Sequence, residues 1–571
     1  MPPTPGVAPR QRVLTLIAGD QGLQRPCRRI ERVRFTAHPP TGQPVEFLSD
    51  NQYGAWLSGY FPTWWKAEGV DLTLDLGEPT AVSHVRLVST MQPARGKKLY
   101  EAGDLKFSLV LSDDGFAQDV RRTDQPKVTF DETGIYPIFH HDFGRLPTFQ
   151  VEVGSKARYV KVVPVCVNPA KPFVSFQGCE VYGPEPADDL VVKTFAADVN
   201  GDGSNELVVG TSNREIAAYD ASGKRLWSSR VPGDIFTMAC ADLDEDGKSE
   251  VLAETMREAL HCLNGDGTER YRADLNQALR KVMGDEHVDN NTAAAGALAL
   301  GVWAPEGPQS KVVVVPSEIS YRVNGKGEAE PCWFFQDWGW RGAARLINLW
   351  PNEPEVLATV GPSITLFSPR RDADGNYVRL ANKQPIGRPG AWLMHSFGWA
   401  QQVDLPGYKG LLAANEGGVN WCPMDYLTSD AQTGGWGFDT GGVPIVAALA
   451  EDLNGDGLPE VCLAREDGFV NVLSLATGAP LAVGSGRSAL NTGEPILGMA
   501  VLGAETGSSP RRLAVGTRFA VHVYGPDFAR ISRTEAPAIG FAGPAGRERD
   551  RVFIVQPDGQ IAVLALSRGS G

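Results

Sequence analysis

Three short segments of this sequence carry oxygen-bearing side chains at a spacing that suits a divalent cation. They read Asp198-Val-Asn-Gly-Asp-Gly-Ser-Asn-Glu, Asp242-Leu-Asp-Glu-Asp-Gly-Lys-Ser-Glu and Asp452-Leu-Asn-Gly-Asp-Gly-Leu-Pro-Glu. Each places carboxylate or amide oxygens at alternate positions, adds a backbone carbonyl and ends on a glutamate. This is the calcium-ligand order of an EF-hand loop in shortened form. We therefore expect three Ca2+ sites, and we call these segments the calcium turns.

Each calcium turn is expected to hold its ion with four side chains and one backbone oxygen. So many carboxylates in one turn would repel one another unless a cation neutralised them. Two similar turns, Asp372-Ala-Asp-Gly and Asn264-Gly-Asp-Gly, lack the late glutamate and are interpreted as ordinary tight turns. The expected ligands are the side chains of Asp198, Asn200, Asp202, Glu206, Asp242, Asp244, Asp246, Glu250, Asp452, Asn454, Asp456 and Glu460, with backbone oxygens of Ser204, Lys248 and Leu458.

Strands flank each calcium turn and predict the architecture that positions it. Each unit continues with a second strand, a third such as Ile216-Ala-Ala-Tyr, a glycine turn and a fourth such as Arg225-Leu-Trp-Ser. Degenerate units fit the same rhythm, with first strands beginning near residues 191, 234, 295, 341, 396, 443, 495 and 537. Repeated four-stranded units predict a β-propeller, with eight blades favoured and seven as the alternative. The last unit lacks a fourth strand, which Arg12-Val-Leu-Thr-Leu-Ile would supply.

The region before the repeat predicts a second all-β domain. Its landmarks are Leu72-Thr-Leu-Asp-Leu-Gly-Glu-Pro, Ser112-Asp-Asp-Gly, Ala157-Arg-Tyr-Val-Lys-Val and Cys179-Glu-Val-Tyr-Gly. In this order they resemble the discoidin, or coagulation-factor type C, jelly roll of many carbohydrate-binding modules. The predicted fold is therefore all-β, a jelly-roll sandwich followed by a propeller. Its parts are an N-terminal segment at 1–27, a discoidin-like carbohydrate-binding domain at 28–185 and a calcium-binding β-propeller at 186–571.

The discoidin-like resemblance implies that ligand binds in loops at one end of the sandwich. The aromatic loop Tyr60-Phe-Pro-Thr-Trp-Trp is the best candidate, because flat rings stack on sugar faces. We expect Trp64 and Trp65 to make these contacts. The alternative is that both rings cap the domain core.

The opposite end of the propeller from the calcium turns is expected to hold the ligand. Loops that enter the first strands, and loops between second and third strands, share this end, which we call the mouth face. The calcium turns lie at the other face and would be structural. Arginines and tryptophans at one mouth suit an anionic, ring-shaped ligand such as a uronate sugar, although each arginine could instead pair with a neighbouring glutamate. The substrate-binding residues expected there are Trp338, Trp340, Arg214, Arg257, Arg322 and Arg465.

The repeat resembles the FG-GAP and related repeats of integrin-type and lyase-type propellers. Together with a sugar-binding module, it resembles the propeller polysaccharide lyases, including rhamnogalacturonan, ulvan and rhamnose–glucuronate lyases. The resemblance implies β-elimination, in which a base removes the C5 proton of a uronate while a cation neutralises its carboxylate. His287 or His395 would be the base and Tyr321 the proton donor. Arg341, with Arg322 or Arg257, would clamp the carboxylate.

Two other functions remain open at this point. One is a non-catalytic adhesion or scaffold protein whose mouth binds glycan or protein. The other is a glycoside hydrolase, which would need two carboxylates such as Glu318 and Glu416 facing each other.

Composition and charge narrow the expected partners. A formal net charge of -14 disfavours nucleic acid, no apolar run is long enough to cross a membrane, and no CxxC pair points to zinc. The 64 glycines and 41 prolines are spread along the chain, which favours short strands and turns over helical bundles. We expect a secreted or periplasmic monomer that binds Ca2+ and an acidic polysaccharide or oligosaccharide.

Overall fold

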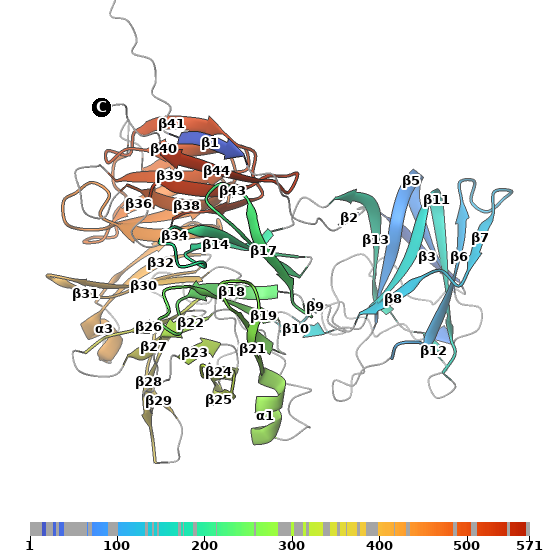
Figure 1. The fold of residues 1–571 in the computed structure, drawn as a ribbon, viewed down its shortest axis with the longest axis horizontal. Coiled ribbons are helices and arrows are strands. Elements are labelled where there is room, and N and C mark those ends of the chain that lie inside the picture. Colours follow the sequence, from blue (N-terminus) through green and yellow to red (C-terminus); the bar gives the residue numbers. More distant parts are fainter. Residues whose placement is uncertain are drawn as a thin grey trace, which may run out of the picture.

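The computed structural model is built almost entirely from β-strands, arranged as a ring of four-stranded sheets beside a separate sandwich (Figure 1). The predicted all-β propeller class is confirmed. The structure describes residues 14–18, 27–29, 33–38, 65–66, 71–89, 101–131, 135–139, 142–145, 148–168, 173–174, 176–186, 191–212, 214–233, 235–255, 259–283, 298–301, 312–315, 319–334, 343–350, 355–360, 363–373, 377–383, 398–415, 417–429, 434–483, 488–503, 511–544 and 549–566.

Eight four-stranded sheets follow one another in the described part of the chain, and we number them blades 1 to 8. Blades 1 to 4 are β14 (Val191–Ala197), β15 (Glu206–Thr211), β16 (Glu215–Tyr219) and β17 (Arg225–Arg230); β18 (Ile235–Ala241), β19 (Glu250–Thr255), β20 (Ala259–Leu263) and β21 (Glu269–Asp274); β22 (Ala299–Gly301), β23 (Val312–Val315), β24 (Ile319–Val323) and β25 (Ala329–Phe334); and β26 (Ala343–Ile347), β27 (Val356–Val360), β28 (Ile364–Arg371) and β29 (Tyr377–Lys383).

Blades 5 to 7 continue the pattern, and blade 8 borrows a strand from the N-terminal end of the chain. They are β30 (Gly398–Leu405), β31 (Tyr408–Asn415), β32 (Gly418–Pro423) and β33 (Trp436–Asp439); β34 (Ile445–Glu451), β35 (Glu460–Arg465), β36 (Phe469–Ser474) and β37 (Ala489–Asn491); β38 (Ile496–Leu502), β39 (Arg512–Thr517), β40 (Ala520–Tyr524) and β41 (Arg530–Glu535); and β42 (Gly540–Ala542), β43 (Arg551–Val555), β44 (Ile561–Leu566) and β1 (Leu14–Ala18).

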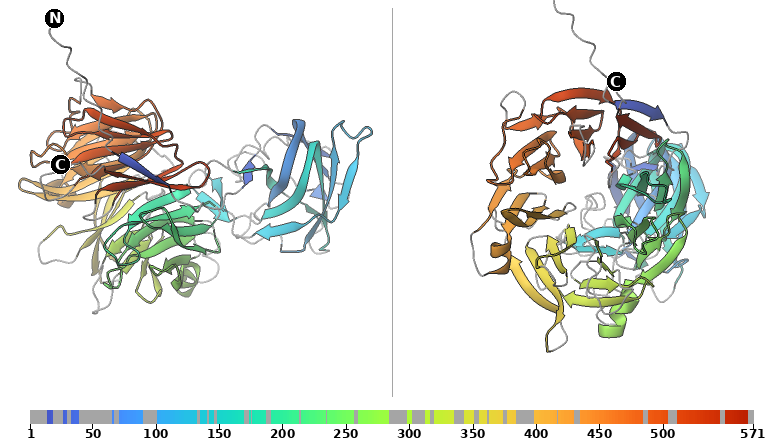
Figure 2. Two further views of the ribbon diagram at one scale, coloured as in Figure 1. Left: turned by 45° about the horizontal axis from the view of Figure 1, so that its top comes forward. Right: turned by 60° about the vertical axis from the view of Figure 1, so that its left-hand side comes forward.

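Strand β1 pairs antiparallel with β44, with Leu14 opposite Leu566 (Figure 2). The first and last described strands of the chain therefore lie in one sheet. Among the described residues, two short helices accompany the blades, α1 (Leu275–Met283) after blade 2 and α3 (Met424–Thr428) in blade 5. Neither helix in the described part of the chain has the length and apolarity needed to cross a bilayer.

Burial along the strands explains why the repeat folds into stacked blades. The second and third strands of blades 1 and 2 are buried at every position, because each is covered on both faces by neighbouring blades. The fourth strand, β17, alternates between half-buried and exposed residues, as expected for the outer edge. A continuous apolar run therefore indicates a strand inside the blade. An alternating pattern indicates the outer strand.

Tryptophan side chains on outer strands connect neighbouring blades at two junctions. The indole Nε1 of Trp227 in blade 1 donates to the carbonyl oxygen of Gly265 in the β20–β21 turn of blade 2, at 2.8 Å. The same ring covers Gly267, where an added Cβ would lie 2.6 Å from it. Gly267 also has a φ of +82°, a backbone conformation that favours glycine. Both the lack of space and the backbone conformation therefore require glycine there. Trp436 makes the same pair of contacts with Leu475 and Gly478 at the junction of blades 5 and 6.

The sandwich is organised around two bent strands of 19 residues, β5 (Asp71–Ser89) and β11 (Thr148–Cys166). The register between β5 and β11 shifts near Gly154, which has a positive φ of +55°. The two halves of each strand therefore pair in different parts of the sheet. The other strands are β2 (Cys27–Arg29), β3 (Arg34–His38), β6 (Leu105–Ser112), β7 (Arg121–Asp124), β8 (Val128–Asp131) and β13 (Phe176–Pro186), with small pairs β4 (Trp65–Lys66)–β12 (Phe173–Val174) and β9 (Ile135–Phe139)–β10 (Asp142–Arg145). Leucine, valine and phenylalanine side chains from β5, β6, β11 and β13 fill one core.

Histidine His84 of β5 makes the stability of the sandwich sensitive to acid. It is 8% exposed, and burial and then the charge of Arg86 lower its pKa to about 4. The unfolded chain takes up a proton below its ordinary pKa of about 6.5, whereas the folded one does not until about 4. Stability is therefore lost as the pH falls through this window. At pH 5 the loss should be about 2 kcal/mol in the free energy of unfolding.

Urea unfolding of the wild type and His84→Gln at pH 7 and pH 5 measures this effect. The variant should lose about 2 kcal/mol less than the wild type between the two pH values. Equal losses in both proteins would show that His84 is not the responsible group.

The sandwich contacts the propeller at the mouth face. Asp131, the last residue of β8, accepts a hydrogen bond from Arg214 at 2.5 Å, and Arg214 lies in the loop between the second and third strands of blade 1. The hairpin β9–β10 also lies beside the ring in both orientations of Figure 2. The mouth face is therefore shared by propeller loops and the N-terminal domain.

Candidate metal centre and mouth face

The three calcium turns fold in the same way. In the first, Asp198 accepts the backbone N–H groups of Gly201 and Gly203, at 2.7 and 2.8 Å. Its late glutamate, Glu206, accepts the N–H of Val199 at 3.0 Å. The second turn repeats these bonds through Asp242 and Glu250, and the third through Asp452 and Glu460. Sequence spacing alone thus produces one local structure at three places.

A second set of bonds fixes the middle carboxylates. Asn200 and Asn454 accept the N–H of Asp202 and Asp456 at 2.8 Å in both cases. The carboxylates of Asp202, Asp246 and Asp456 then each accept an N–H, again at 2.8 Å, from Ser204, Lys248 and Leu458. In the first and third turns the other oxygen of the same carboxylate accepts the amide N–H of Asn200 or Asn454, at 3.1 Å in both cases. These bonds hold the side chains in a tight turn, and each carboxylate oxygen keeps a further lone pair for a cation.

Each turn ends on a glutamate that begins a second strand and is nearly inaccessible. Glu206, Glu250 and Glu460 are 1%, 2% and 3% exposed. Burial, with repulsion from the aspartates of the turn, raises the pKa of Glu206 to about 7 and also raises the pKa of Glu250 and Glu460. A carboxylate so placed is costly without a positive partner.

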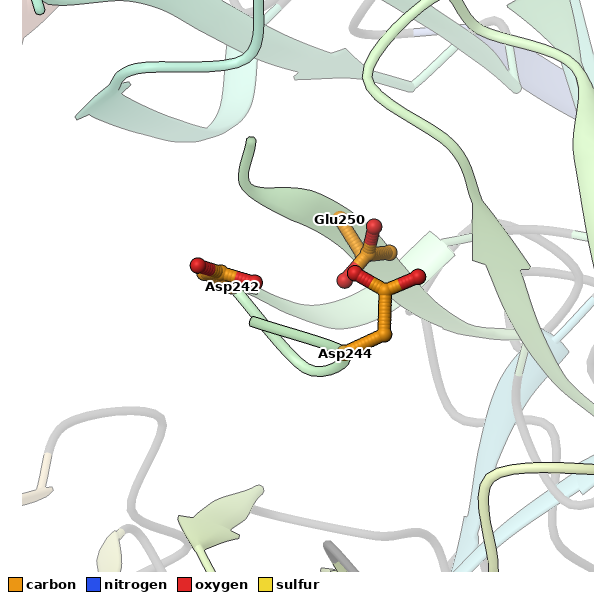
Figure 3. A group of neighbouring side chains, drawn as sticks. All are labelled: Asp242, Asp244 and Glu250. Atoms are coloured by element: carbon orange, nitrogen blue, oxygen red, sulfur yellow. The ribbon is translucent and has the colours of Figure 1, made fainter. Parts of the chain in front are cut away.

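The geometry of the second turn meets the first requirement of a metal site. Ligand atoms of Asp242, Asp244 and Glu250 all lie within 4.8 Å of one another (Figure 3). Every expected metal ligand in the three turns is an oxygen atom. Oxygen ligands suit Ca2+ or Mg2+, whereas softer metal ions prefer thiolate ligands. The residues therefore fit the predicted Ca2+, whose presence stays a prediction.

The second turn differs from the others because an arginine lies against it. Arg270 of β21 donates to Asp244 at 2.6 Å and lies 3.4 Å from the Oε1 of Glu250. The residue at the position of Asp244 is asparagine in the first and third turns. The positive charge of Arg270 neutralises the additional negative charge of Asp244. Arg270 would therefore compete with a metal ion for the carboxylates of this turn. We expect the second turn to bind Ca2+ more weakly than the other two.

Several residues predicted for the mouth, or for the aromatic loop of the discoidin-like domain, lie outside the described part of the chain. The side chain of Trp65 is among them, although its backbone forms β4. The others are His287, His395, Arg341, Trp338, Trp340, Arg257 and Trp64.

Tyr321 is not in a mouth loop, as the sequence had led us to expect, but within β24. It is 7% exposed and packs between blades 2 and 3 with Leu260 and Val323. Its neighbour Arg322 forms an ion pair with Glu330 at 3.0 Å, and Glu330 also binds Arg371 of blade 4. The third repeat lacks a calcium turn, so its sequence did not indicate where β24 begins. Both residues stabilise contacts within and between blades.

Arg214 and Arg465 do lie at the mouth face, and both are already engaged. Arg214 binds Asp131 of the sandwich. Arg465 pairs with Asp467, and its guanidinium lies 5.4 Å from the ring centre of Phe469. Their charges are partly neutralised before any ligand arrives.

A cluster at the mouth end of blade 7 was not singled out from the sequence. Glu494 accepts hydrogen bonds from Thr517 and from Arg533, the latter at 2.6 Å. The buried His522 lies behind it, with its Nε2 at 3.7 Å from the carboxylate. These contacts help to keep the pKa of Glu494 below its usual range, against burial, while burial lowers the pKa of His522. The sequence did contain one indication of the buried His522. The segment Ala520-Val-His-Val-Tyr matches Ala259-Leu-His-Cys-Leu in blade 2, with a histidine at the same position.

The sheet topology defines the C-terminal region as a β-propeller. No family model matches the chain, and no curated protein matches it. Solved structures similar to it include the C-terminal WD40 domain of Sif2 (13% identity, TM-score 0.44, covering 66% of this chain and 96% of that one). BamB from Moraxella catarrhalis matches at 14% identity and a TM-score of 0.40, covering 67% and 98%.

A complex of BBS1N with ARL6DN matches at 12% identity and a TM-score of 0.40, covering 67% of this chain and 94% of that one. These likenesses concern the fold alone.

Proposed function

We propose that this protein is a secreted or periplasmic, calcium-binding propeller that acts on an acidic polysaccharide at its mouth face. The observation that carries the proposal is the ion pair between Asp131 of the sandwich and Arg214 of the propeller. This ion pair joins the end of β8 in the sandwich to a mouth loop of blade 1. In the proposal the sandwich is the sugar-binding domain. A polymer held by the sandwich would therefore pass near the mouth.

The proposed reaction is β-elimination of a uronate-containing glycan. His287 or His395 would remove the C5 proton, and Arg341 with Arg257 would neutralise the carboxylate. Tyr321 is not retained as proton donor and Arg322 is not retained in the clamp, because both are committed to contacts within the blades. The calcium turns take no part in this chemistry and stabilise the opposite face.

A non-catalytic glycan-binding role is the second candidate. It is favoured by the same contacts that weaken the catalytic assignment. Arg214 and Arg465 are paired with carboxylates, so they would contribute less to neutralising a substrate.

The test is a panel of pectic, ulvan-like, gum arabic-type and glycosaminoglycan polymers incubated with the full chain and Ca2+. β-Elimination creates a double bond conjugated with the carboxylate, so new ultraviolet absorbance should accompany new reducing ends. Reducing ends without absorbance would indicate hydrolysis, and neither signal would leave the binding role. If absorbance appears, replacing the base by alanine in His287→Ala or His395→Ala should reduce the rate by about 10²–10⁴. Unchanged rates in both variants would refute the assignment of the base.

A further inference from the structure

One aromatic side chain of the mouth face is largely open to solvent. Phe519 lies between β39 and β40 of blade 7 and is 54% exposed. No other phenylalanine, tyrosine or tryptophan whose side chain the structure describes is as exposed. The residue directly before the third strand is a glycine in blades 5 and 6, namely Gly417 and Gly468. The turn of the repeat therefore does not need an aromatic ring at this position.

Hydrogen bonds place a polar cluster directly beside Phe519. The backbone N–H of Phe519 donates to the hydroxyl oxygen of Thr517 at 3.3 Å, and that hydroxyl donates to the carboxylate of Glu494. Arg533 of the neighbouring strand β41 donates to the same carboxylate at 2.6 Å. Glu494 enters blade 7 at the mouth face, so these contacts bring its carboxylate and the guanidinium to the end of the blade that carries the exposed ring.

The cluster keeps hydrogen-bonding capacity for a ligand. The side chains of Glu494, Arg533 and Glu535 are 15%, 33% and 79% exposed. Arg533 donates through Nη1 to Glu535 and through Nη2 to Glu494, whereas a guanidinium carries five N–H donors. Each carboxylate oxygen of Glu494 accepts one hydrogen bond and can accept a second. Unused donors and acceptors thus lie side by side near the ring of Phe519.

We infer that the mouth end of blade 7 is a subsite for an uncharged sugar unit of a glycan, which stacks on Phe519 and is hydrogen-bonded by Glu494 and Arg533. Aromatic rings pack against the apolar face of a sugar. A carboxylate beside a guanidinium offers acceptors and donors to neighbouring hydroxyl groups. Two carboxylates outnumber the one guanidinium in this hydrogen-bonded cluster, so a uronate would be repelled here.

This subsite rests on the proposed function, because it takes the mouth face to hold a glycan. It deepens that function by naming a second kind of sugar unit. A polymer in which uronates alternate with neutral sugars would place the neutral unit on blade 7 and the uronate elsewhere at the mouth. The subsite itself requires no catalysis.

The test is saturation-transfer NMR of the full chain in Ca2+ with the methyl glycosides of galactose, glucose and rhamnose, and with sodium glucuronate. At least one neutral glycoside should receive saturation at its ring C–H protons. Phe519→Ala should reduce this transfer at least about fivefold, whereas Phe519→Tyr should retain it because a tyrosine ring stacks in the same way. Ile531→Ala is the matched control, since it removes an exposed apolar side chain near the opposite end of the same blade.

Two results of this experiment would overturn the subsite. One is the absence of transfer to all three neutral glycosides, and the other is equal transfer in the wild type and Phe519→Ala. Any transfer to glucuronate should be the same in these two proteins. A loss for glucuronate as large as the loss for the neutral glycoside would contradict the preference for an uncharged sugar.

A second pair of variants tests the polar contacts. Glu494→Gln should weaken binding of the neutral glycoside about tenfold, because a hydrogen bond to a charged acceptor is lost. Asp527→Asn changes an exposed carboxylate in the β40–β41 turn, at the other end of blade 7, and should bind like the wild type. Melting curves establish that each variant is folded. Equal affinities of Glu494→Gln and the wild type would refute the polar contacts.

Failure of the subsite and failure of the lyase proposal give different results. Transfer to a neutral glycoside that depends on Phe519, without ultraviolet product from any polymer, would support the subsite and remove the lyase proposal. Ultraviolet product formed by Phe519→Ala with the KM and kcat of the wild type would support the lyase proposal and remove the subsite.

Discussion

Removal of calcium is expected to lower the melting temperature of the propeller by about 10 °C, because each emptied turn leaves several carboxylates around a buried glutamate. Differential scanning calorimetry with Ca2+ and with excess chelator measures the shift. Asp198→Ala and Asp452→Ala should each remove about half of it, since the first and third turns lack a competing arginine. A melting curve that is indifferent to chelator and to added Ca2+ would refute the metal sites.

Matched variants separate calcium binding from ordinary turn stability. Asp266→Ala changes an aspartate that accepts bonds from Thr268 in a similar turn without a late glutamate, so it should leave the chelator effect intact. Arg270→Met should strengthen Ca2+ binding at the second turn, because it removes the cation beside Asp244 and Glu250. An unchanged number of tightly bound Ca2+ ions per chain in Arg270→Met would show that the arginine does not compete.

Substitution Gly265→Ala should destabilise the propeller by about 3 kcal/mol or more, at the upper end of the range for overpacking. An added Cβ at this position would lie 1.9 Å from the carbonyl oxygen of Val199, in the first calcium turn of the neighbouring blade. The oxygen belongs to the backbone, and the added Cβ is bonded directly to the backbone at residue 265, so neither atom can move aside cheaply. The change would also disturb the Trp227 hydrogen bond to the Gly265 carbonyl.

Chemical unfolding of Gly265→Ala and Gly525→Ala checks this prediction. Gly525 occupies a corresponding turn of blade 7, where an added Cβ would meet its nearest atom, Oδ1 of Asp527, at 3.1 Å and could displace it. Gly525→Ala should therefore cost far less than Gly265→Ala. Similar costs for the two variants would show that the contact between blades 1 and 2 is not as tight as described.

The positions of the calcium turns could be predicted because most of the bonds that shape each turn are local, whereas the contact of Arg270 with the second turn is not. Asp198 and Glu206 are eight residues apart, and the bonds that hold them lie within the same turn. The first strands were also placed within a few residues of the observed starts, since the hydrophobic rhythm of a repeat is carried by the sequence itself. Both results follow from patterns that a single unit contains.

The mouth could not be predicted to the same degree, because its contacts join distant parts of the chain. Asp131 and Arg214 are 83 residues apart and belong to different domains, so no spacing rule links them. Tyr321 was misplaced for a different reason. The third repeat lacks a calcium turn, so the boundary between loop and strand had no marker.

The pairing of β1 with β44 has a consequence for how the protein is made. The partners Leu14 and Leu566 lie far apart in the sequence, so β1 must wait for the much later synthesis of β44 before the two strands can pair. Such a long-range contact is slow to form, and until then blade 8 presents an open edge. The sandwich and the earlier blades can fold meanwhile, in the order of their synthesis. Closure of the ring is then the final step, and an interrupted chain would remain an open, association-prone arc.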